Sequence, residues 1–292
     1  MKIIDAHLHF SDIASFHKTA LDISNIDYSS KGLKKEFEES NIILGIGMGL
    51  TEKEREGFPD SLSNNPMNLD LEQDIPKSLV YCLGINPERL KGEEKELQIQ
   101  EIKNKLEDER VVGLKIYAGY YPYYVYDKIY HPIYKLAAEH DLPVVIHTGD
   151  TYSERGLLKY SHPLAIDELA VRFRNVNFVM AHFGDPWIMD AAEIILKNSN
   201  VYADLSGLLV GDAKQVDRFM NEPLFVDHIK RGLVYTDNYF KFMFGTDWPL
   251  VQINPYIEFV KKLVPKEFHD YVFYKNAIKI FPRIKNILPL EK

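Results

Sequence analysis

Short apolar runs alternate with longer mixed stretches along most of this chain. Eight runs have the length and composition of β-strands. They cover residues 2–7, 42–49, 78–85, 111–117, 142–148, 176–182, 200–206 and 241–247. Several runs are apolar at nearly every position, which is typical of parallel strands that are covered on both faces.

The stretches between these runs have the pattern of helices. We predict helices over residues 31–40, 93–108, 130–140, 163–174, 189–197, 211–230 and 256–263. Strands that alternate with helices indicate repeated β/α units. Eight such units favour a (β/α)8 TIM barrel of the α/β class, with a doubly wound open sheet as the alternative.

The sequence predicts one domain over residues 1–292. It contains no linker rich in Pro, Gly and Ser and no low-complexity tract, and barrels of this length fold as one unit. The stretch 51–73 is long, polar and rich in Asn, Pro and Glu. We interpret it as an extended loop inserted after the second strand.

Composition and charge narrow the function classes. The formal net charge is −8 and no dense Lys/Arg run is present, which argues against nucleic acid as a partner. No segment reaches the roughly 20 consecutive apolar residues that a membrane span needs. The first residues include an acid and a histidine where a signal peptide needs an apolar stretch, so we expect a cytoplasmic protein. We expect a small-molecule substrate as its partner, and the sequence leaves a homo-oligomer open.

Cys82 is the only cysteine in the sequence. It can form no intrachain disulfide, and no thiolate cluster can bind a metal. Any metal site must therefore use His, Asp, Glu or Lys side chains.

Histidine and aspartate residues lie where the predicted strands end. His7 and His9 flank Leu8 where the first strand ends, and positions i and i+2 of a strand point to the same face. His147, His182 and Asp247 end the fifth, sixth and eighth strands. Because the active sites of these barrels lie at the C-terminal ends of the strands, all five side chains are expected to converge.

A single histidine at a strand end is more often a hydrogen-bonded structural residue than a metal ligand. The joint placement of four histidines and an aspartate favours a metal site. Three or more imidazoles and a carboxylate suit zinc, with manganese or iron as alternatives. The absence of thiolates disfavours copper(I).

Three further side chains are candidates for substrate binding. Tyr117 follows the fourth strand, where its hydroxyl could contact a substrate. Arg155 lies in the loop after His147 and could bind a carboxylate, although an exposed loop arginine is an equally good interpretation. Trp248 follows Asp247 and could line a pocket or belong to the core.

Several ordered motifs resemble those of a known family. They are Asp-Ala-His-Leu-His at 5–9, Gly-Leu-Lys-Ile at 113–116, Pro-Val-Val-Ile-His-Thr-Gly at 143–149, Ala-His-Phe-Gly at 181–184, Phe-Gly-Thr-Asp-Trp-Pro at 244–249, and Asn-Ala followed by Ile-Phe at 276–281. This set resembles the amidohydrolase superfamily, in particular the amidohydrolase-related branch that includes aminocarboxymuconate-semialdehyde decarboxylase. The resemblance covers nearly the whole chain.

The resemblance implies a role for each strand-end residue. His7, His9, His147 and Asp247 would bind one divalent metal, with Zn2+ preferred over Mn2+ or Fe2+. His182 would orient or deprotonate the metal-bound water or bind a second ion, and Asp247 would also accept a proton from that water. A lysine at the position of Lys115 is carboxylated in some two-metal relatives, but Lys115 could instead bind a substrate carboxylate or pair with a neighbour. One metal is favoured over two.

These roles leave the reaction open. The leading hypothesis is a hydrolase that cleaves a C–O or C–N bond of a lactone, ester or amide. The first alternative is a metal-dependent decarboxylase, a lyase, of a small unsaturated or aromatic acid. The second is a non-catalytic barrel that binds a metal or ligand, against which the intact set of ligands weighs.

Overall fold

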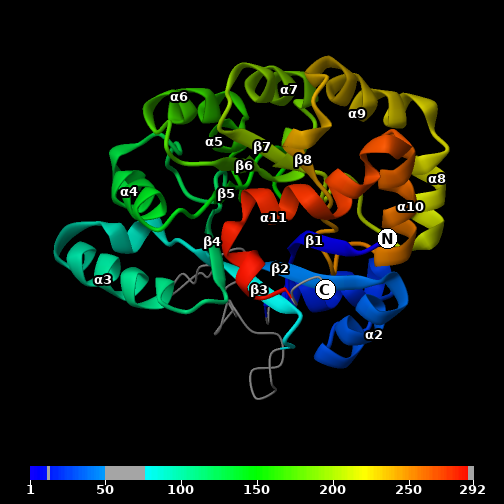
Figure 1. The fold of residues 1–292 in the computed structure, drawn as a ribbon, viewed down its shortest axis with the longest axis horizontal. Coiled ribbons are helices and arrows are strands. Elements are labelled where there is room, and N and C mark those ends of the chain that lie inside the picture. The colour runs from blue at the N-terminus through cyan, green and yellow to red at the C-terminus, as the bar shows by residue number, and fades with distance from the viewer. Residues whose placement is uncertain (12–13, 50–75, 289–292) are drawn as a thin grey trace.

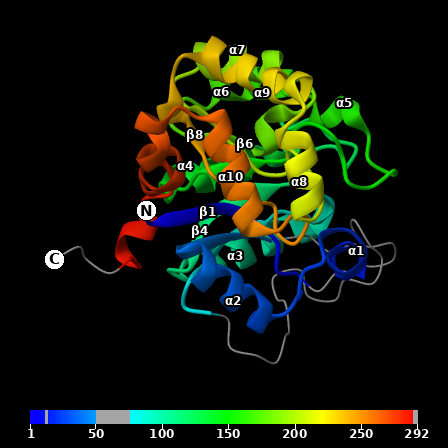
Figure 2. The ribbon, with the colours of Figure 1, turned by 90° about the vertical axis from the view of Figure 1, so that its right-hand side faces the viewer.

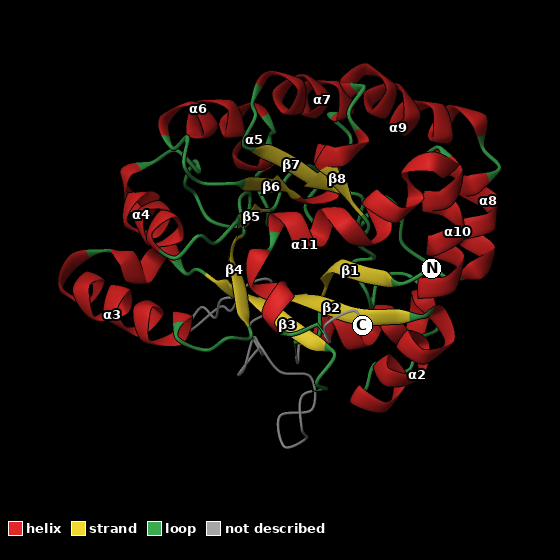
Figure 3. Cartoon of the chain, viewed as in Figure 1, coloured by secondary structure: helices red, strands yellow, loops and turns green. Residues whose placement is uncertain are grey.

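The computed structural model describes residues 1–11, 14–49 and 76–288. Its strands form one sheet that follows the order of the chain, and each neighbouring pair is parallel. They are β1 (Ile3–Leu8), β2 (Ile42–Met48), β3 (Leu79–Gly84), β4 (Val111–Ile116), β5 (Val144–Ile146), β6 (Phe178–Met180), β7 (Val201–Asp204) and β8 (Phe242–Met243). Figures 1 and 3 show these strands around a common centre with helices outside them. This is the (β/α)8 barrel that the sequence predicts.

Helices cover the outside of the barrel and one of its ends. They are α1 (Ala14–Thr19), α2 (Ser30–Ser40), α3 (Lys95–Leu106), α4 (His131–Glu139), α5 (Leu158–Ser161), α6 (Leu164–Arg172), α7 (Ile188–Lys197), α8 (Ala213–Met220), α9 (Pro223–Thr236), α10 (Ile253–Leu263) and α11 (Asn276–Ile280). Figure 2 shows α8 and α10 side by side. No helix in the described ranges is both long and apolar enough to cross a membrane. The predicted loop at 51–73 lies outside the described residues.

The helix predicted over 211–230 is wrong, because the chain forms two helices there. Helix α8 ends at Met220 and α9 begins at Pro223. A proline inside a helix lacks the N–H for the backbone ladder and clashes with the preceding turn, but it fits the first position of a new helix. The Glu222 side chain caps α9 by accepting a hydrogen bond from the Leu224 N–H at 3.2 Å.

Backbone hydrogen bonds join β1 to the segment that follows β8. Ala6 N donates to the Phe244 carbonyl at 2.9 Å, and Asp247 N donates to the His7 carbonyl at 2.8 Å. These bonds connect the first strand to the last and place Asp247 directly beside His7.

The pairing of β1 with β2 shifts between Asp5 and Leu8, around the predicted metal ligand His7. Asp5 pairs with Gly45 and Leu8 with Gly47, so three steps along β1 match two along β2. An extra residue of this kind bends a strand and redirects its side chains.

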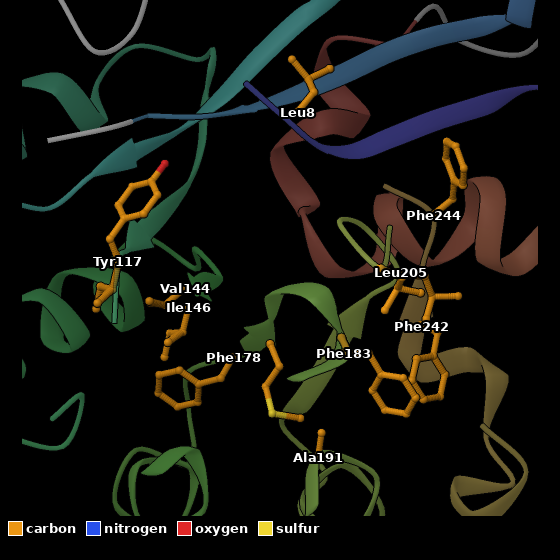
Figure 4. Close-up of a cluster of buried hydrophobic side chains, with 14 of the residues drawn as sticks. Leu8, Tyr117, Val144, Ile146, Phe178, Phe183, Ala191, Leu205, Phe242 and Phe244 are labelled. Atoms are coloured by element: carbon orange, nitrogen blue, oxygen red, sulfur yellow. The ribbon is translucent and has the colours of Figure 1, made fainter. Parts of the chain in front are cut away.

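Buried apolar side chains pack both outside and inside the ring of strands. Figure 4 shows part of the outer layer, where the Phe183 and Phe242 rings lie 4.9 Å apart between their centroids. The inner layer includes Val80, Val112 and Val145, together with Ile280 of α11. Helix α11 thus covers the end of the barrel opposite the strand-end histidines (Figure 1).

Candidate metal and active site

His7 lies at the end of β1, and Asp204 at the end of β7 fixes the orientation of its ring. His7 Nδ1 is 2.8 Å from Asp204 Oδ2, and both side chains are fully buried. An ionised carboxylate only accepts hydrogen bonds, so Nδ1 carries the proton and Nε2 keeps a free lone pair. Burial lowers the pKa of His7 below its ordinary value, which keeps the ring neutral. A metal-binding histidine is usually neutral, donates its single N–H to a carboxylate or carbonyl, and coordinates the metal through the other nitrogen.

Asp204 also binds the segment that carries His182. Its Oδ1 accepts hydrogen bonds from His182 N at 3.0 Å, from Ser206 N at 3.2 Å and from Ser206 Oγ at 2.5 Å. Burial alone would raise the pKa of Asp204, but His7 and these donors outweigh it and hold the pKa well below the ordinary value. Asp204 is therefore ionised. No role for this residue was predicted from the sequence, although it lies in the strand predicted over 200–206.

Asp247 faces both histidines of β1. Its Oδ1 is 3.1 Å from His9 Nε2 and 3.5 Å from His7 Nε2. Burial would raise the pKa of Asp247, but the nearby His182 and His9 lower it well below its ordinary value. The carboxylate is therefore ionised and can bind a cation or accept a proton.

His182 approaches the same point from the loop after β6. Its Nδ1 lies 2.9 Å from Ser206 Oγ and 3.2 Å from the Ser206 carbonyl, which assigns the proton to Nδ1 and leaves Nε2 free. Burial lowers the pKa of His182, so the ring is neutral. His182, His7 and Asp247 each offer one ligand atom, and these three atoms lie within 4.8 Å of one another.

Two backbone conformations and one glycine make this convergence possible. His182 has φ 61° and Asp247 has φ 67°, both in the left-handed region that non-glycine residues rarely adopt. Gly207 lies against both side chains, and a Cβ on it would come 2.5 Å from His182 Nδ1 and 2.9 Å from Asp247 Oδ2. Only glycine fits at this position.

The structure places the remaining predicted ligands close by. The His147 ring centroid is 5.1 Å from that of His182, but His147 Nε2 is 2.9 Å from the Asp150 carbonyl. His147 therefore has only Nδ1 left for a metal. His9 adjoins Asp247, as described above. Within the described residues, the three-residue group within ligand distance includes His182 but neither His9 nor His147.

A cavity of about 270 Å³ lies beside these residues. Its lining includes Lys115, Tyr117, Tyr120, Asp150 and Tyr152, in addition to four of the five predicted strand-end residues. Such a volume lies at the lower end of small-molecule pockets. The sequence did not single out Asp150 or Tyr152 as site residues, because their loop matches no motif.

Of the three side chains predicted to bind substrate, only Tyr117 lines this cavity. Its hydroxyl donates to the Met48 carbonyl at 3.2 Å, and burial raises its pKa well above the ordinary value, so the phenol stays protonated. Arg155 is exposed and lies outside the cavity lining. Trp248 is fully buried, and its indole N–H donates to Glu36 Oε1 at 3.1 Å.

The chain belongs to the amidohydrolase family, whose sequence model matches residues 86–283. Members of this family are enzymes, either hydrolases or decarboxylases, and they typically bind a divalent metal. This assignment agrees with the resemblance that the ordered motifs show. No curated protein sequence matches the chain.

Solved structures share the whole fold at low sequence identity. An uncharacterised TIM-barrel protein from Bordetella bronchiseptica is 17% identical with a TM-score of 0.71, over 98% of this chain and 100% of that one. A probable 2-pyrone-4,6-dicarboxylic acid hydrolase from Acinetobacter baumannii is 16% identical with a TM-score of 0.63, over 97% and 100%. The 2,6-dihydroxybenzoate decarboxylase from Rhizobium is 12% identical with a TM-score of 0.63, over 97% and 99%. At these identities the likeness concerns the fold.

Proposed function

We propose that this chain is a metal-dependent hydrolase that cleaves a C–O or C–N bond of a small lactone, ester or amide. The observation that carries the proposal is the convergence of His7, His182 and Asp247 at the C-terminal ends of the strands, with ligand atoms within 4.8 Å. Family membership supports it, because the family consists of hydrolases and decarboxylases.

The residues fit a divalent cation. His7 Nε2 is buried and has no hydrogen-bond partner among the described residues, yet it lies 3.5 Å from Asp247 Oδ1. Two atoms that each present a lone pair repel one another unless a cation or a proton lies between them. This geometry supports His7 and Asp247 as ligands. We assign His9 and His147 as the other two because the family resemblance implies them, with His147 using Nδ1, and we prefer zinc because the donors are imidazoles and a carboxylate.

When bound, the metal would lower the pKa of a water molecule and polarise the substrate oxygen. The chain supplies the proton acceptors. Asp247 is ionised, and His182 has a free Nε2 directed away from Ser206. The ionised Asp204 stabilises positive charge that develops on His182 through Ser206 Oγ, which accepts from His182 and donates to Asp204.

A decarboxylase is the second candidate, and one observation favours it. Non-oxidative decarboxylation of an aromatic or unsaturated acid needs a cation to hold the substrate. Arg155 lies outside the cavity lining, but the buried Lys115 is part of it.

The test measures metal content and activity on the same preparation. The protein is incubated with lactones, esters and amides, with acid release as the readout, and separately with aryl and enoic acids, with CO2 release as the readout. We expect acid release that a chelator abolishes and that Asp247→Ala lowers at least 100-fold. Asp227→Ala, which removes an exposed carboxylate of α9 outside the cavity lining, is the control and keeps the activity.

The outcomes separate the candidates. CO2 release without acid release replaces the hydrolase with the decarboxylase. Full turnover by Asp247→Ala contradicts the proposed role of this carboxylate in either reaction.

A further inference from the structure

The cavity beside the candidate metal site has an apolar side and a polar side. The segments after β1, β7 and β8 form the apolar side, and these three strands are neighbours in the closed ring. Its apolar side chains are those of Phe16, Leu208, Leu209, Val210 and Leu250. The polar side comes from β4 and the segments after β5 and β6, and it includes Lys115, Asp150 and Asp185. A ligand in this cavity therefore meets two different chemical surroundings.

The apolar side begins directly at the reacting groups of the candidate site. Gly207, which precedes Leu208 in the chain, lies against the side chains of His182 and Asp247. Leu250 N donates to the Asp247 carbonyl at 3.0 Å. A group that contacts Leu208 and Leu250 is therefore next to the atoms on which His182 and Asp247 act.

Phe16 extends the apolar side from α1. Its side chain is buried, and its ring centroid lies 4.9 Å from that of His9. The Tyr152 ring, from the loop after β5, lies 6.1 Å from the Phe16 ring. The apolar side thus reaches around the proposed metal ligands from the segment after β7 to the segment after β1.

This side of the cavity offers few partners to a polar ligand group. Leu208 N already donates to the Tyr256 hydroxyl at 3.1 Å, and Leu250 N is bound to Asp247 as described above. Among the described side chains that line this side, only His9 and Asp247 are polar, and both are proposed metal ligands. A charged or polar group placed here would lose its hydration without replacement, whereas a hydrocarbon group gains by leaving water.

We propose that the apolar side is a subsite for a compact, uncharged hydrocarbon group attached directly to the carbonyl group of the substrate. The substrate class is then esters, amides or lactones whose acyl part is aliphatic and carries no charge. The cavity volume of about 270 Å³ limits this acyl part to a short chain. The bond that is cleaved rests on the proposed function, but the preference of this side for hydrocarbon does not.

Calorimetric titration of the zinc-loaded protein with linear hydroxamates tests the subsite. A hydroxamate coordinates a metal through its own two oxygens, so its acyl chain is left to contact the cavity wall. We expect affinity to rise about fourfold for each methylene group added from acetohydroxamate through propionohydroxamate to butanohydroxamate, which is the gain for a buried methylene group.

Two charged probes of similar length test the exclusion of polar groups. 3-Aminopropanohydroxamate ends in an ammonium group, and the monohydroxamate of succinic acid ends in a carboxylate. We expect each to bind at least 10-fold more weakly than butanohydroxamate, because its charge would lose water on the apolar side.

One variant and a matched control locate the subsite. Leu250→Asn keeps much of the side-chain volume but makes this part of the wall polar, and we expect the gain per methylene group to fall below twofold. Acetohydroxamate is too short to depend on the wall, so its unchanged affinity shows that the variant is folded and metal-loaded. Leu224→Asn alters a leucine of α9 that is 81% exposed and lies outside the cavity lining, and we expect wild-type affinities.

Several results would overturn the inference. They are no hydroxamate binding by the zinc-loaded protein, an affinity that does not rise with chain length, tighter binding of a charged probe than of butanohydroxamate, and a wild-type gain per methylene group in Leu250→Asn. Failure of the proposed function has a different signature: the dependence on chain length persists, but no ester, lactone or amide is hydrolysed.

Discussion

Asp204 orients two of the imidazoles in the site at once. Its Oδ2 accepts from His7, and its Oδ1 accepts from the backbone and side chain of the segment that holds His182. Asp204→Asn would present an NH2 group to one of these donors and leave it without an acceptor. We expect metal affinity to fall about 10- to 100-fold, as measured by competition with a chelator. Unchanged affinity would contradict the role of Asp204 in orienting His7.

Ser206→Ala is the matched control for this variant. It removes the hydroxyl contact with His182 but keeps the backbone carbonyl contact and the His7–Asp204 hydrogen bond. We therefore expect Ser206→Ala to lower turnover more than metal affinity.

Gly207 offers a second test at the residue scale. Gly207→Ala would place a methyl group 2.5 Å from His182 Nδ1 and strain a backbone with φ 60°. We expect a loss of about 1–3 kcal/mol in the free energy of unfolding, together with loss of activity. Gly92 has φ 57° with no atom within 4 Å of its virtual Cβ, so Gly92→Ala carries the backbone cost alone. Equal activity in the two variants would show that the contact with His182 is unimportant.

The sequence alone was enough to predict that five candidate residues lie at one end of a barrel. The periodicity of a strand decides which of its side chains point to the same face. The sequence could not assign Asp204, whose role depends on His7, 197 residues away along the chain. It could not rank Arg155 against Lys115 either. Which cation lines the cavity depends on the path of the loops.

At the scale of elements, Glu36 connects three parts of the outer layer. From α2 it accepts hydrogen bonds from Trp248 Nε1 and from the N–H of Ile253, the first residue of α10, both at 3.1 Å. Burial raises its pKa above the ordinary 4.5, and this outweighs the two donors. The folded chain therefore keeps a proton on Glu36 at pH values where the unfolded chain has lost it.

This shift predicts how stability depends on pH. As the pH rises from about 4.5 through the raised pKa, the folded state binds more protons than the unfolded state, so the free energy of unfolding falls. Glu36→Gln cannot titrate, and we expect its urea stability to lack this decline. Parallel pH curves for the two proteins between pH 4 and 7 would contradict the prediction.

Element ends were less predictable than element types. The runs at 176–182 and 241–247 were expected to be strands throughout, but β6 ends at Met180 and β8 at Met243. The reason is local. His182 and Asp247 adopt left-handed φ values that a strand cannot contain. Their side chains are two of the three whose ligand atoms converge in the proposed metal site.

At the scale of the whole molecule, the proposed metal site lies at the seam of the barrel, where the segment after β8 meets β1. Three of its four proposed ligands come from β1 and from the segment after β8, which four backbone hydrogen bonds already connect. A ligand that binds only the folded state adds about 2.7 kcal/mol of stability at a hundredfold excess over its Kd. We expect chelation to lower the melting temperature by several degrees in wild type but not in Asp247→Ala. An equal response of both proteins would place the metal elsewhere.

The same seam has a consequence for how the protein matures during synthesis. Asp5 and Thr246, which hydrogen-bond across it, are separated by 241 positions in the chain, and all eight strands must be in place before they meet. A ribosome-bound chain that has emerged only as far as β7 would carry His7 and His9 without Asp247. Metal uptake would then come late in assembly, and partly made chains would compete poorly for scarce ions in the cell.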